Sequence, residues 1–334
     1  MKITGFGDYL IHFSPQEYER FAQADLLRIN FTGAEANVCA ALALWGDDVS
    51  FVTRLPQNVL ADRAVTTLRT FGIDSSHVAR GGKRMGAYYL EKGASVRKSL
   101  VIYDRDHSAF TEATETDFDF DAILSDTDLL YLTGITPALS ESLFSCCLTL
   151  CKMAKEKGVK IAYDVNFRPT LLSAQKAGEN LLVYAPYLDY LIGNEEHLKQ
   201  LLGLQSEYGE NETEKRVDAL IGKVRKKTGI EKIAVTVRRT PSASDAIFSA
   251  AYSDGKETVF SGTAHIHVVD RVGSGDAFSA GLLYGLEHEP NTQKTLDFAV
   301  ASAALKHTVM GDINYSSPAE IASVLDTGFG DVIR

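Results

Sequence analysis

From residue 128 onward, short apolar runs alternate with longer amphipathic stretches, and this alternation restricts the fold more than any other feature. The apolar runs lie at 128–133, 159–163, 187–192 and 233–237. Strands that alternate with helices of about 10–18 residues are joined by right-handed crossovers and form a parallel sheet covered by helices on both faces. We therefore expect a three-layer α/β/α sandwich with a mostly parallel central sheet.

Capping residues set the expected helix bounds. Ser140 is placed to cap a helix that runs to Lys157, and Gly158 ends it. Asn194 opens another helix, and a long charged helix is expected over 212–228. Two further helices, near 276–287 and 294–309, are expected to close the chain.

The first hundred residues do not follow this alternation of strands and helices. Residues 88–93 and 97–103 are typical of two strands joined by a turn at Gly93. Residues 9–31 mix apolar pieces with an acidic stretch at 15–20 that could be helical. We expect an early β insertion, made from these segments, attached to the sandwich.

Size and charge exclude several classes of protein. The chain has 334 residues, larger than a usual single domain, and its net charge of −10 disfavours nucleic-acid binding as the main activity. No apolar run approaches the length of about 18 residues that a membrane span needs. The N-terminal segment meets a charge at Asp8 and lacks a cleavage site, so no signal peptide is expected. Cys39, Cys146, Cys147 and Cys151 lack metal-like spacing and are expected to be buried, reduced thiols in a cytoplasmic protein.

The strongest chemical signal lies between Asp270 and Gly281, where a Gly273-Ser274-Gly275 turn leads directly into a helix. Glycines allow backbone N–H groups to converge, and the helix N-terminus adds a positive dipole, which together suit a phosphoryl group. Asp276 lies at the mouth of this site and could accept a proton from a hydroxyl group. The alternative is that Asp276 is a simple N-cap.

A second signal lies at 31–43, where a helix of small residues begins. Gly33 allows a close backbone approach, and Asn37 faces the same direction one helical turn later. For the alanines of this helix we prefer plain helix–sheet packing as the explanation. Polar residues also follow the expected strands, where parallel α/β sheets place their ligands. They are Asp8, Asp164, Asn166, Arg168, Asn194, Thr236 and Arg238.

Both signals together resemble the two signatures of the ribokinase-like (PfkB) carbohydrate kinases. The resemblance covers nearly the whole chain in order, including a closing Gly311-Asp312 followed by Pro318. That family transfers the γ-phosphoryl group of ATP to a sugar hydroxyl and uses Mg²⁺. The resemblance implies one ribokinase-like kinase domain over residues 1–334. It implies a small β lid inserted from 9–31 and 84–112, through which a homodimer is expected.

Three stretches, at 86–91, 103–109 and 164–169, are similar to the lid and pocket of 2-keto-3-deoxygluconate kinases. In that subgroup tyrosines and two arginines line a site for an acidic sugar. Arg105 and Arg168 would each hold a carboxylate through paired hydrogen bonds, and two arginines suit a sugar acid better than a neutral sugar. The alternative for both arginines is solvation or a salt bridge with a neighbouring aspartate.

The resemblance assigns roles to residues of this chain. The catalytic set is Asp276, Gly273, Ser274, Gly275 and Arg168, with Asp276 as base and the glycine turn as anion hole. The sugar acid is expected to contact Asp8, Gly33, Ala34, Asn37, Tyr89, Tyr103, Arg105, Arg168, Asp276 and Asp312. ATP is expected to contact Asn166, Asn194, Thr236, Arg238, Gly273, Gly275 and Ala304.

The chain departs from the family pattern in two places. The family carries Asn-x-x-Glu where this chain ends the motif in His197, so the carboxylate associated with the water of Mg²⁺ is missing. Glu195 or Glu196 could substitute, with Glu196 as the candidate metal ligand, or phosphates and water could hold the metal. A second departure is the run 237–244, which lacks the usual glycine turn against the ATP phosphates, and Arg271 stands where threonine is common.

The reaction expected from the sequence is ATP-dependent phosphorylation of a small sugar acid, with 2-keto-3-deoxygluconate as the leading candidate. One alternative is a neutral-sugar kinase of the fructose or ribose type. Another is a non-catalytic sugar-acid sensor with the same fold. A nicotinamide-dependent dehydrogenase would rest only on Gly5 and Gly7, because the third glycine of the dinucleotide fingerprint is absent.

Overall fold

The computed structural model describes residues 1–209 and 211–327. Its large sheet has the strand order β14-β13-β12-β11-β10-β9-β1-β4, with β15 paired to β13. Strands from β12 to β4 run parallel to their neighbours, whereas β13 runs antiparallel to β12. The bounds are β1 (Lys2–Phe6), β4 (Asp48–Val52), β9 (Leu129–Thr133), β10 (Lys160–Asp164), β11 (Tyr190–Asn194), β12 (Lys232–Arg239), β13 (Asp245–Ser253), β14 (Thr258–Phe260) and β15 (Ala264–His267).

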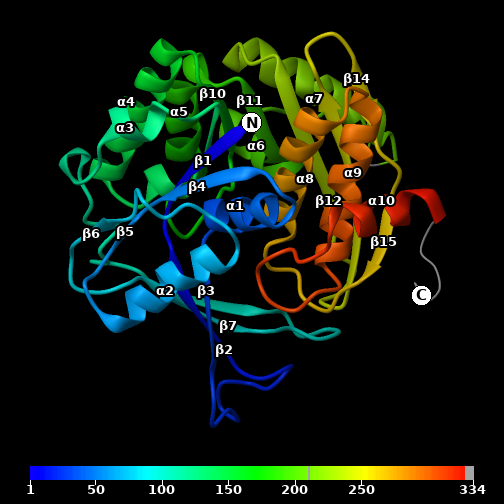
Figure 1. Cartoon of the computed structure of the whole chain (residues 1–334). Helices are drawn as coiled ribbons and strands as arrows, with labels where there is room; N and C mark the ends of the chain where they lie inside the picture. Colours follow the sequence, from blue (N-terminus) through cyan, green and yellow to red (C-terminus); the bar gives the residue numbers. More distant parts are fainter. Residues whose placement is uncertain (210, 328–334) are drawn as a thin grey trace.

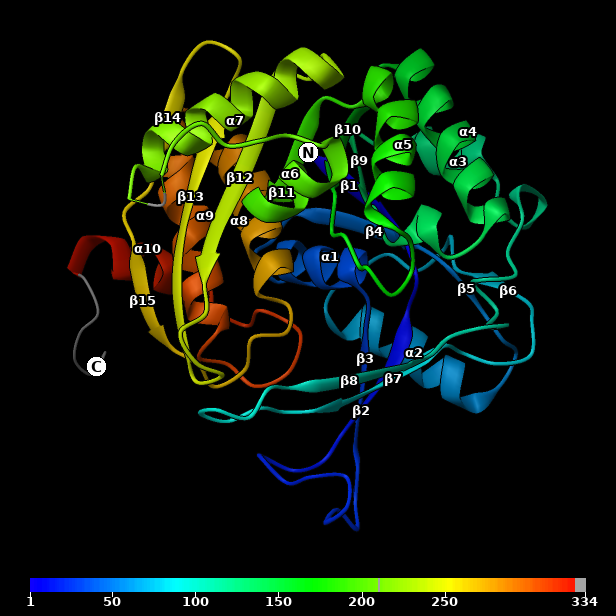
Figure 2. The same cartoon turned by 180° about the vertical axis from the view of Figure 1, so that it is seen from behind.

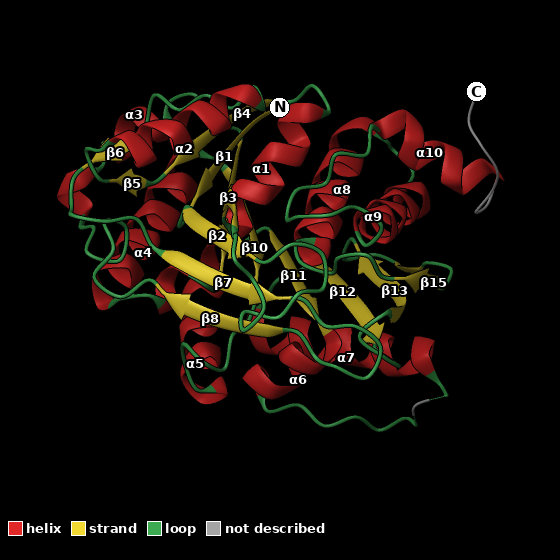
Figure 3. Cartoon of the chain, turned by 90° about the horizontal axis from the view of Figure 1, so that it is seen from below, coloured by secondary structure: helices red, strands yellow, loops and turns green. Residues whose placement is uncertain are grey.

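Helices cover both faces of this sheet (Figure 3). One face carries α1 (Ala34–Leu44), α8 (Ser274–His288) and α9 (Thr292–Lys306), with α2 (Val59–Thr70) and α10 (Pro318–Thr327) further out. The other face carries α3 (Phe120–Leu124), α4 (Glu141–Lys157), α5 (Ala174–Tyr184), α6 (Glu195–Leu202) and α7 (Thr213–Thr228). Each side has its own large apolar core. The expected α/β/α sandwich is confirmed.

Local sequence signals explain where several elements start and stop. The Oγ of Ser140 accepts the backbone N–H of Leu143 at 3.2 Å, which caps α4 as expected. Gly158 ends this helix in the left-handed region at φ 76°. The N-cap of α6 is Asn194, whose side chain accepts the N–H of Glu196. All four cysteines are buried and free, as expected.

Three elements differ from the sequence expectation. Residues 15–20 form turns and not a helix, because this short exposed stretch has no apolar face to pack and Glu17 takes φ 45°. Strand β11 begins only at Tyr190, because residues Ala185–Tyr187, with Pro186, form a 3₁₀ turn first. A third closing helix, α10, begins at a proline and buries Ile321.

A separate four-stranded sheet, here called the small sheet, lies at the end of the large sheet to which β12 points (Figure 2). Its order is β3 (Arg28–Thr32), β2 (Leu10–Ser14), β7 (Ala87–Glu91), β8 (Leu100–Asp104). The β7–β8 hairpin confirms the two early strands that the sequence predicted. Residues 15–27 form a loop that projects away from the body of the molecule (Figure 1). In the described part of the chain, no helix combines the length and apolar character that a membrane crossing requires.

Candidate active site

A cavity of about 350 Å³ lies between the small sheet and the carboxyl ends of the large sheet's strands. This is where a parallel α/β sheet places its ligands. Most of the residues expected in the site line this one cavity. They are Asp8, Gly33, Ala34, Asn37, Tyr103, Arg105, Asn166, Arg168, Asn194, Thr236, Arg238, Gly273, Ser274, Gly275, Asp276 and Asp312.

The glycine turn has the geometry of an anion site. Gly273 is the N-cap of α8 and has φ 78°, and a Cβ added there would lie 1.8 Å from the carbonyl oxygen of Asp312. Any other residue would therefore displace the loop that carries Asp312. Since α8 begins at Ser274, the free amides and the positive end of a 15-residue helix face the cavity. An anion in the cavity would meet these donors directly.

Asp276 lies in the first turn of α8 and is oriented from a second helix. The Nδ2 amide of Asn37 donates to Oδ2 of Asp276 at 2.7 Å. The hydroxyl of Thr32 in turn donates to Oδ1 of Asn37 at 2.8 Å. Burial raises the pKa of Asp276 to about 7, although the bond from Asn37 opposes this shift. Because α8 is capped by Gly273, Asp276 is not a simple N-cap, and its carboxylate can exchange a proton near neutral pH.

The opposite wall of the cavity holds Asp8, Tyr103 and Arg105. The Arg105 side chain is 5% exposed, its Nη1 lies 3.8 Å from Oδ2 of Asp8, and its guanidinium lies 4.1 Å from the Tyr103 ring centre. Among the described residues, neither carboxylate oxygen of Asp8 has a hydrogen-bond partner, nor does Nε of Arg105. Burial raises the pKa of Asp8 to about 6, and Arg105 opposes this shift. Such buried groups without partners indicate a polar ligand.

One expected residue, Tyr89, does not line the cavity, and its neighbour Tyr88 does. Successive residues of a strand point to opposite faces, so only one of the two tyrosines can face inward. The hydroxyl of Tyr88 donates to Oδ1 of Asp312, and Nδ1 of His12 lies 2.7 Å from Oδ2 of Asp312. Burial opposes ionisation of Asp312, but His12 and Tyr88 hold its pKa below the usual range. Tyr89 stacks on Phe13 on the outer face of the small sheet.

Further positive charge lies near Asp276. Nη1 of Arg168 donates to the carbonyls of Asn166 and Phe167 at 3.4 and 3.2 Å, and the backbone of Asn166 is held at φ 33°. Strained backbone of this kind clusters at functional sites. Asp164 accepts the N–H of Asn166 at 2.9 Å, and burial raises its pKa to about 6. Arg238 lines the same wall, and burial lowers its pKa.

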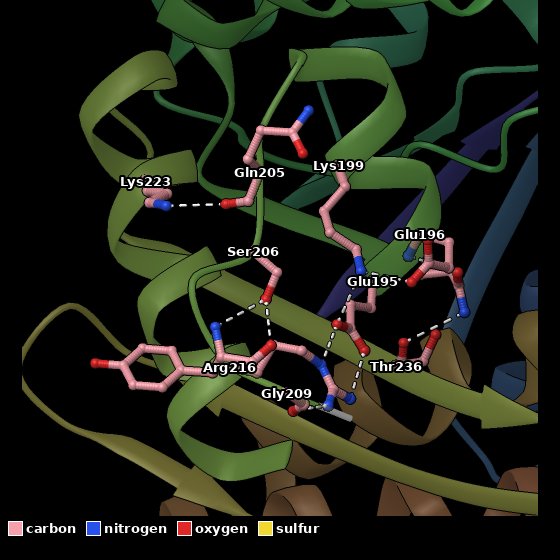
Figure 4. A network of polar contacts seen from close by, with 11 residues as sticks. Glu195, Glu196, Lys199, Gln205, Ser206, Gly209, Arg216, Lys223 and Thr236 are labelled. Atoms are coloured by element: carbon pink, nitrogen blue, oxygen red, sulfur yellow. Dashed lines mark hydrogen bonds and ion pairs between the residues drawn. The ribbon is translucent and has the colours of Figure 1, made fainter. Parts of the chain in front are cut away.

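The candidate metal ligand Glu196 does not line the cavity. It is exposed and forms an ion pair with Lys199 (Figure 4). Glu195 is equally unsuited, because both of its carboxylate oxygens accept from the buried Arg216, at 2.6 and 3.1 Å. His197 is the residue of this helix turn that lines the cavity. No cluster of three or more metal-binding side chains occurs within residues 1–209 and 211–327.

Ala304 is the third expected residue that lies away from the cavity, after Tyr89 and Glu196. It is buried inside α9, in the apolar core that this helix shares with α8. The sequence could not separate it from a pocket residue, because a small residue in a helix suits either place. Residues of the cavity that the sequence reasoning did not assign include Tyr88, Glu35 and His197.

The fold and the cavity together define a phosphotransferase. The α/β sandwich carries an anion-binding turn at Gly273–Gly275, here called the anion turn, with the buried carboxylate of Asp276 beside it. The cavity also has polar side chains under the small sheet, where a phosphoryl acceptor could bind. The family model for pfkB family carbohydrate kinases matches residues 2–320. The chain belongs to this family, and it is a carbohydrate kinase. Membership overturns the dehydrogenase alternative. The structure gives the reason, since β1 leads into β2 and not into the helix that a dinucleotide fingerprint requires.

Several relatives match this chain over nearly the full length of both proteins. The 2-dehydro-3-deoxygalactonokinase of Haloferax volcanii is 32% identical over 333 residues, covering 100% of this chain and 99% of that protein. The solved structure of 2-dehydro-3-deoxygluconokinase from Thermotoga maritima is 39% identical with a TM-score of 0.94, covering 98% of each chain. Fructokinase from Xylella fastidiosa, solved with bound ATP, has a TM-score of 0.75 at 21% identity over 97% of this chain and 98% of that one, and shares the fold.

Proposed function

We propose that the protein transfers the γ-phosphoryl group of ATP to a hydroxyl of a 2-keto-3-deoxy sugar acid, with 2-keto-3-deoxygluconate as the leading substrate. The observation that carries the proposal is the pair Arg105 and Arg168 in the same cavity as Asp276. A sugar carboxylate would supply the acceptor that Nε of Arg105 lacks. The names of the full-length relatives support the same substrate class.

The residues suggest a division of labour for the transfer. Asp276 accepts the hydroxyl proton as the sugar oxygen attacks the phosphorus in line. The amides of Gly273–Gly275 and the guanidinium of Arg168 stabilise the charge that spreads over the transferred group. Asp8 would accept hydrogen bonds from sugar hydroxyls, since its carboxylate oxygens accept none within the described residues. The small sheet acts as a lid that excludes water, since an open site would hydrolyse ATP.

ATP and Mg²⁺ are part of the proposal. Asn166, Asn194, Thr236 and Arg238 line the cavity and are the residues that we assign to the nucleotide. A magnesium ion would be held chiefly by phosphate oxygens and water, because Glu195 is engaged by Arg216 and Glu196 does not line the cavity. Among the carboxylates that line the cavity, we assign Asp164 to assist in holding the magnesium ion. A solved protein from Escherichia coli assigned to ribokinase II holds ATP and Mg²⁺ on this fold.

The test is ADP release with ATP and Mg²⁺ across a panel of acceptors: 2-keto-3-deoxygluconate, its galactonate epimer, gluconate, fructose and ribose. We expect turnover with the keto acids, and the epimer ratio shows which sugar the site prefers. Arg105→Ala should lower kcat/KM for the keto acids by about 100-fold or more, as the loss of a charged hydrogen-bond partner does. Arg80→Ala is the matched control, because Arg80 forms an ion pair with Asp62 of α2 and does not line the cavity.

Two alternatives are outcomes of the same panel. Turnover confined to fructose or ribose would make the protein a neutral-sugar kinase and remove the roles of Arg105 and Arg168. Thermal stabilisation by a keto acid, with no ADP release from any acceptor, would indicate a sugar-acid sensor. The proposal predicts neither result.

We also propose that two copies pair through the outer face of the lid, and that the enzyme works in the cytoplasm, where its reduced thiols would persist. A row of apolar side chains crosses all four strands of that face: Ile29, Phe13, Tyr89 and Ile102. Ile29 is 38% and Ile102 48% exposed, and exposed apolar rows of this kind favour association. Ile102→Glu should convert a dimer to a monomer in light scattering, whereas Val59→Glu, an exposed residue of α2, should not.

A further inference from the structure

A lysine is fully buried directly behind the anion turn. Lys306 ends helix α9 and has 0% of its surface exposed. Its Nζ donates to the backbone carbonyl of Val309 at 3.1 Å and lies 3.5 Å from that of Asp270. Within the described residues no carboxylate comes within ion-pair distance of this ammonium group. Lysines are almost never fully buried without a paired charge, so the position needs an explanation.

The two carbonyls that Lys306 contacts belong to two loops that meet at the anion turn. Asp270 begins the loop that leads into the anion turn, and its carboxylate accepts the N–H groups of Val272 and Gly311, both at 3.2 Å. Val309 belongs to the loop after α9, whose Asp312 carbonyl packs against Gly273. Lys306 therefore bridges the backbones of both loops without lining the cavity itself.

The geometry of the peptide bond links the contact between Lys306 and the Asp270 carbonyl to the orientation of the following backbone. In a planar trans peptide the C=O and the N–H point in opposite directions, so a carbonyl of Asp270 held by Lys306 turns the N–H of Arg271 away from it. Val272 follows, and the glycine turn begins at the next residue, Gly273. Burial lowers the pKa of Lys306, whereas the carboxylates of Asp270, Asp312 and Asp276 raise it. The ammonium is thus electrostatically coupled to the proposed base and to the loop that contacts the lid.

We propose that Lys306 is a positioning residue for phosphoryl transfer. It serves as an internal cation that holds the carbonyls of Asp270 and Val309 and so keeps the Gly273–Gly275 amides aimed at the transferred group. The inference rests on the proposed kinase function, since it assigns Lys306 to the phosphoryl side of that reaction.

The first test is Lys306→Met, which keeps the length of the side chain and removes its charge. Lys306→Met removes the cost of burying a charge but leaves the carbonyls of Asp270 and Val309 without this donor, so we expect the two effects to offset and the Tm to change little. If Lys306 orients the anion turn, kcat should fall by about 10- to 100-fold while the KM for the sugar changes by about twofold or less. The control is Lys232→Met, because the Nζ of Lys232 lies 4.6 Å from the Tyr190 ring centre at the far end of β12.

The second test restores the charge from solution. Lys306→Ala leaves a cavity bounded by the same two carbonyls, and ammonium or methylammonium ions are small enough to enter it. We expect these ions to raise kcat of Lys306→Ala at least about fivefold, as a charge-assisted contact is regained. Tetramethylammonium at equal ionic strength, which has no N–H donor, should have no effect. Met fills the cavity, so Lys306→Met should not respond to any of these ions.

Nucleotide binding separates this inference from the proposed function. By calorimetry with Mg²⁺, the wild type should prefer the non-hydrolysable analogue AMP-PNP over ADP because the anion turn contacts the γ-phosphate, and Lys306→Met should lose that preference. A wild type that binds neither nucleotide refutes the kinase proposal. A wild type with the preference, and a folded Lys306→Met with equal preference and kcat within about twofold, refutes the role of Lys306. If Lys306→Ala does not fold, the Met variant alone decides.

Discussion

The bond between Asn37 and Asp276 makes a pH prediction that can be worked out from the structure. Asp276 must be ionised to accept a proton, and burial raises its pKa to about 7. The amide of Asn37 donates to the carboxylate at 2.7 Å, and this bond stabilises the charged form. Asn37→Ala removes the donor. The pKa of Asp276 must then rise further, so the acid limb of the kcat/KM profile must move to higher pH.

The size of the shift follows from the strength of the bond. A hydrogen bond to a charged group contributes about 1.5–3 kcal/mol, and one pKa unit corresponds to about 1.4 kcal/mol. The acid limb should therefore move by about one to two units, from near pH 7 to about pH 8–9. At pH 7 the ionised fraction would fall about 5- to 50-fold, and activity would recover as the pH rises above 9. The assay is kcat/KM for the sugar from pH 5.5 to 10, because this ratio reports the free enzyme.

The shape of the profile distinguishes this effect from a lost substrate contact. If Asn37 bound only the sugar, Asn37→Ala would lower kcat/KM by the same factor at every pH. Thr32→Val is the graded control, since the Thr32 hydroxyl holds Oδ1 of Asn37 and leaves the bond to Asp276 in place. Its acid limb should move by less than half as much. An Asn37→Ala profile with an unmoved acid limb would refute the assignment of Asp276 as the base.

Three further predictions concern other parts of the cavity. Tyr88→Phe should lower kcat/KM about tenfold, because it removes the hydroxyl that donates to Asp312, whereas Tyr89→Phe on the outer face should leave kinetics unchanged. Asp276→Asn should lower kcat by about 100- to 10,000-fold with little change in sugar binding by calorimetry, and near-normal turnover would contradict the mechanism. Burial raises the pKa of Glu35 to about 7 from 4.5, so its share of stability is present below pH 4.5 and is lost as the pH rises through 7. Glu35→Gln should thus gain up to about 3 kcal/mol relative to wild type between pH 5 and 8 in chemical denaturation, and a constant difference would contradict the shift.

The fold was predictable where local signals and the global pattern agree. Helix α4 is the clearest example, because Ser140 and Gly158 satisfy its two ends and an apolar stripe fixes its buried face. The parallel sheet followed from the alternation of strands and helices. The turns at 15–20 were not predictable, because a short acidic stretch has helical propensity but no surface to bury. Helix α10 was missed because only tertiary burial of Ile321 distinguishes it from a tail.

The site was predictable to the level of segments and not always of side chains. The sequence indicated that the 86–91 segment faces the substrate. Strand periodicity alone does not say which of the two adjacent tyrosines faces inward. The pairing of β7 with β2 and β8 orients Tyr88 toward the cavity. The sequence also could not show that the carboxylate of Glu195 is unavailable to a metal ion. Its partner Arg216 lies on a different helix, and only the tertiary structure shows that the carboxylate is already engaged.

Two of the departures from the family pattern, the run 237–244 and Arg271, meet near the tip of the small sheet. The run after Thr236 forms a hairpin whose Ala243 donates its N–H to the carbonyl of Ser95 at 2.7 Å, while the N–H of Ser95 donates to the hydroxyl of Ser244 at 2.8 Å. Ser95 belongs to the turn between β7 and β8, so this hairpin receives the tip of the lid. Arg271, which also departs from the pattern, donates to the carbonyls of Ser242 and Ala243 at 3.2 and 2.7 Å. Because Arg271 lies in the two-residue segment between Asp270 and the glycine turn, the lid tip, the hairpin and the anion turn form one connected unit. The proposed lid is thereby linked to the loop that would hold the phosphoryl group. If the lid closes over the sugar as proposed, this hairpin would take the place of the glycine turn that is missing after Thr236.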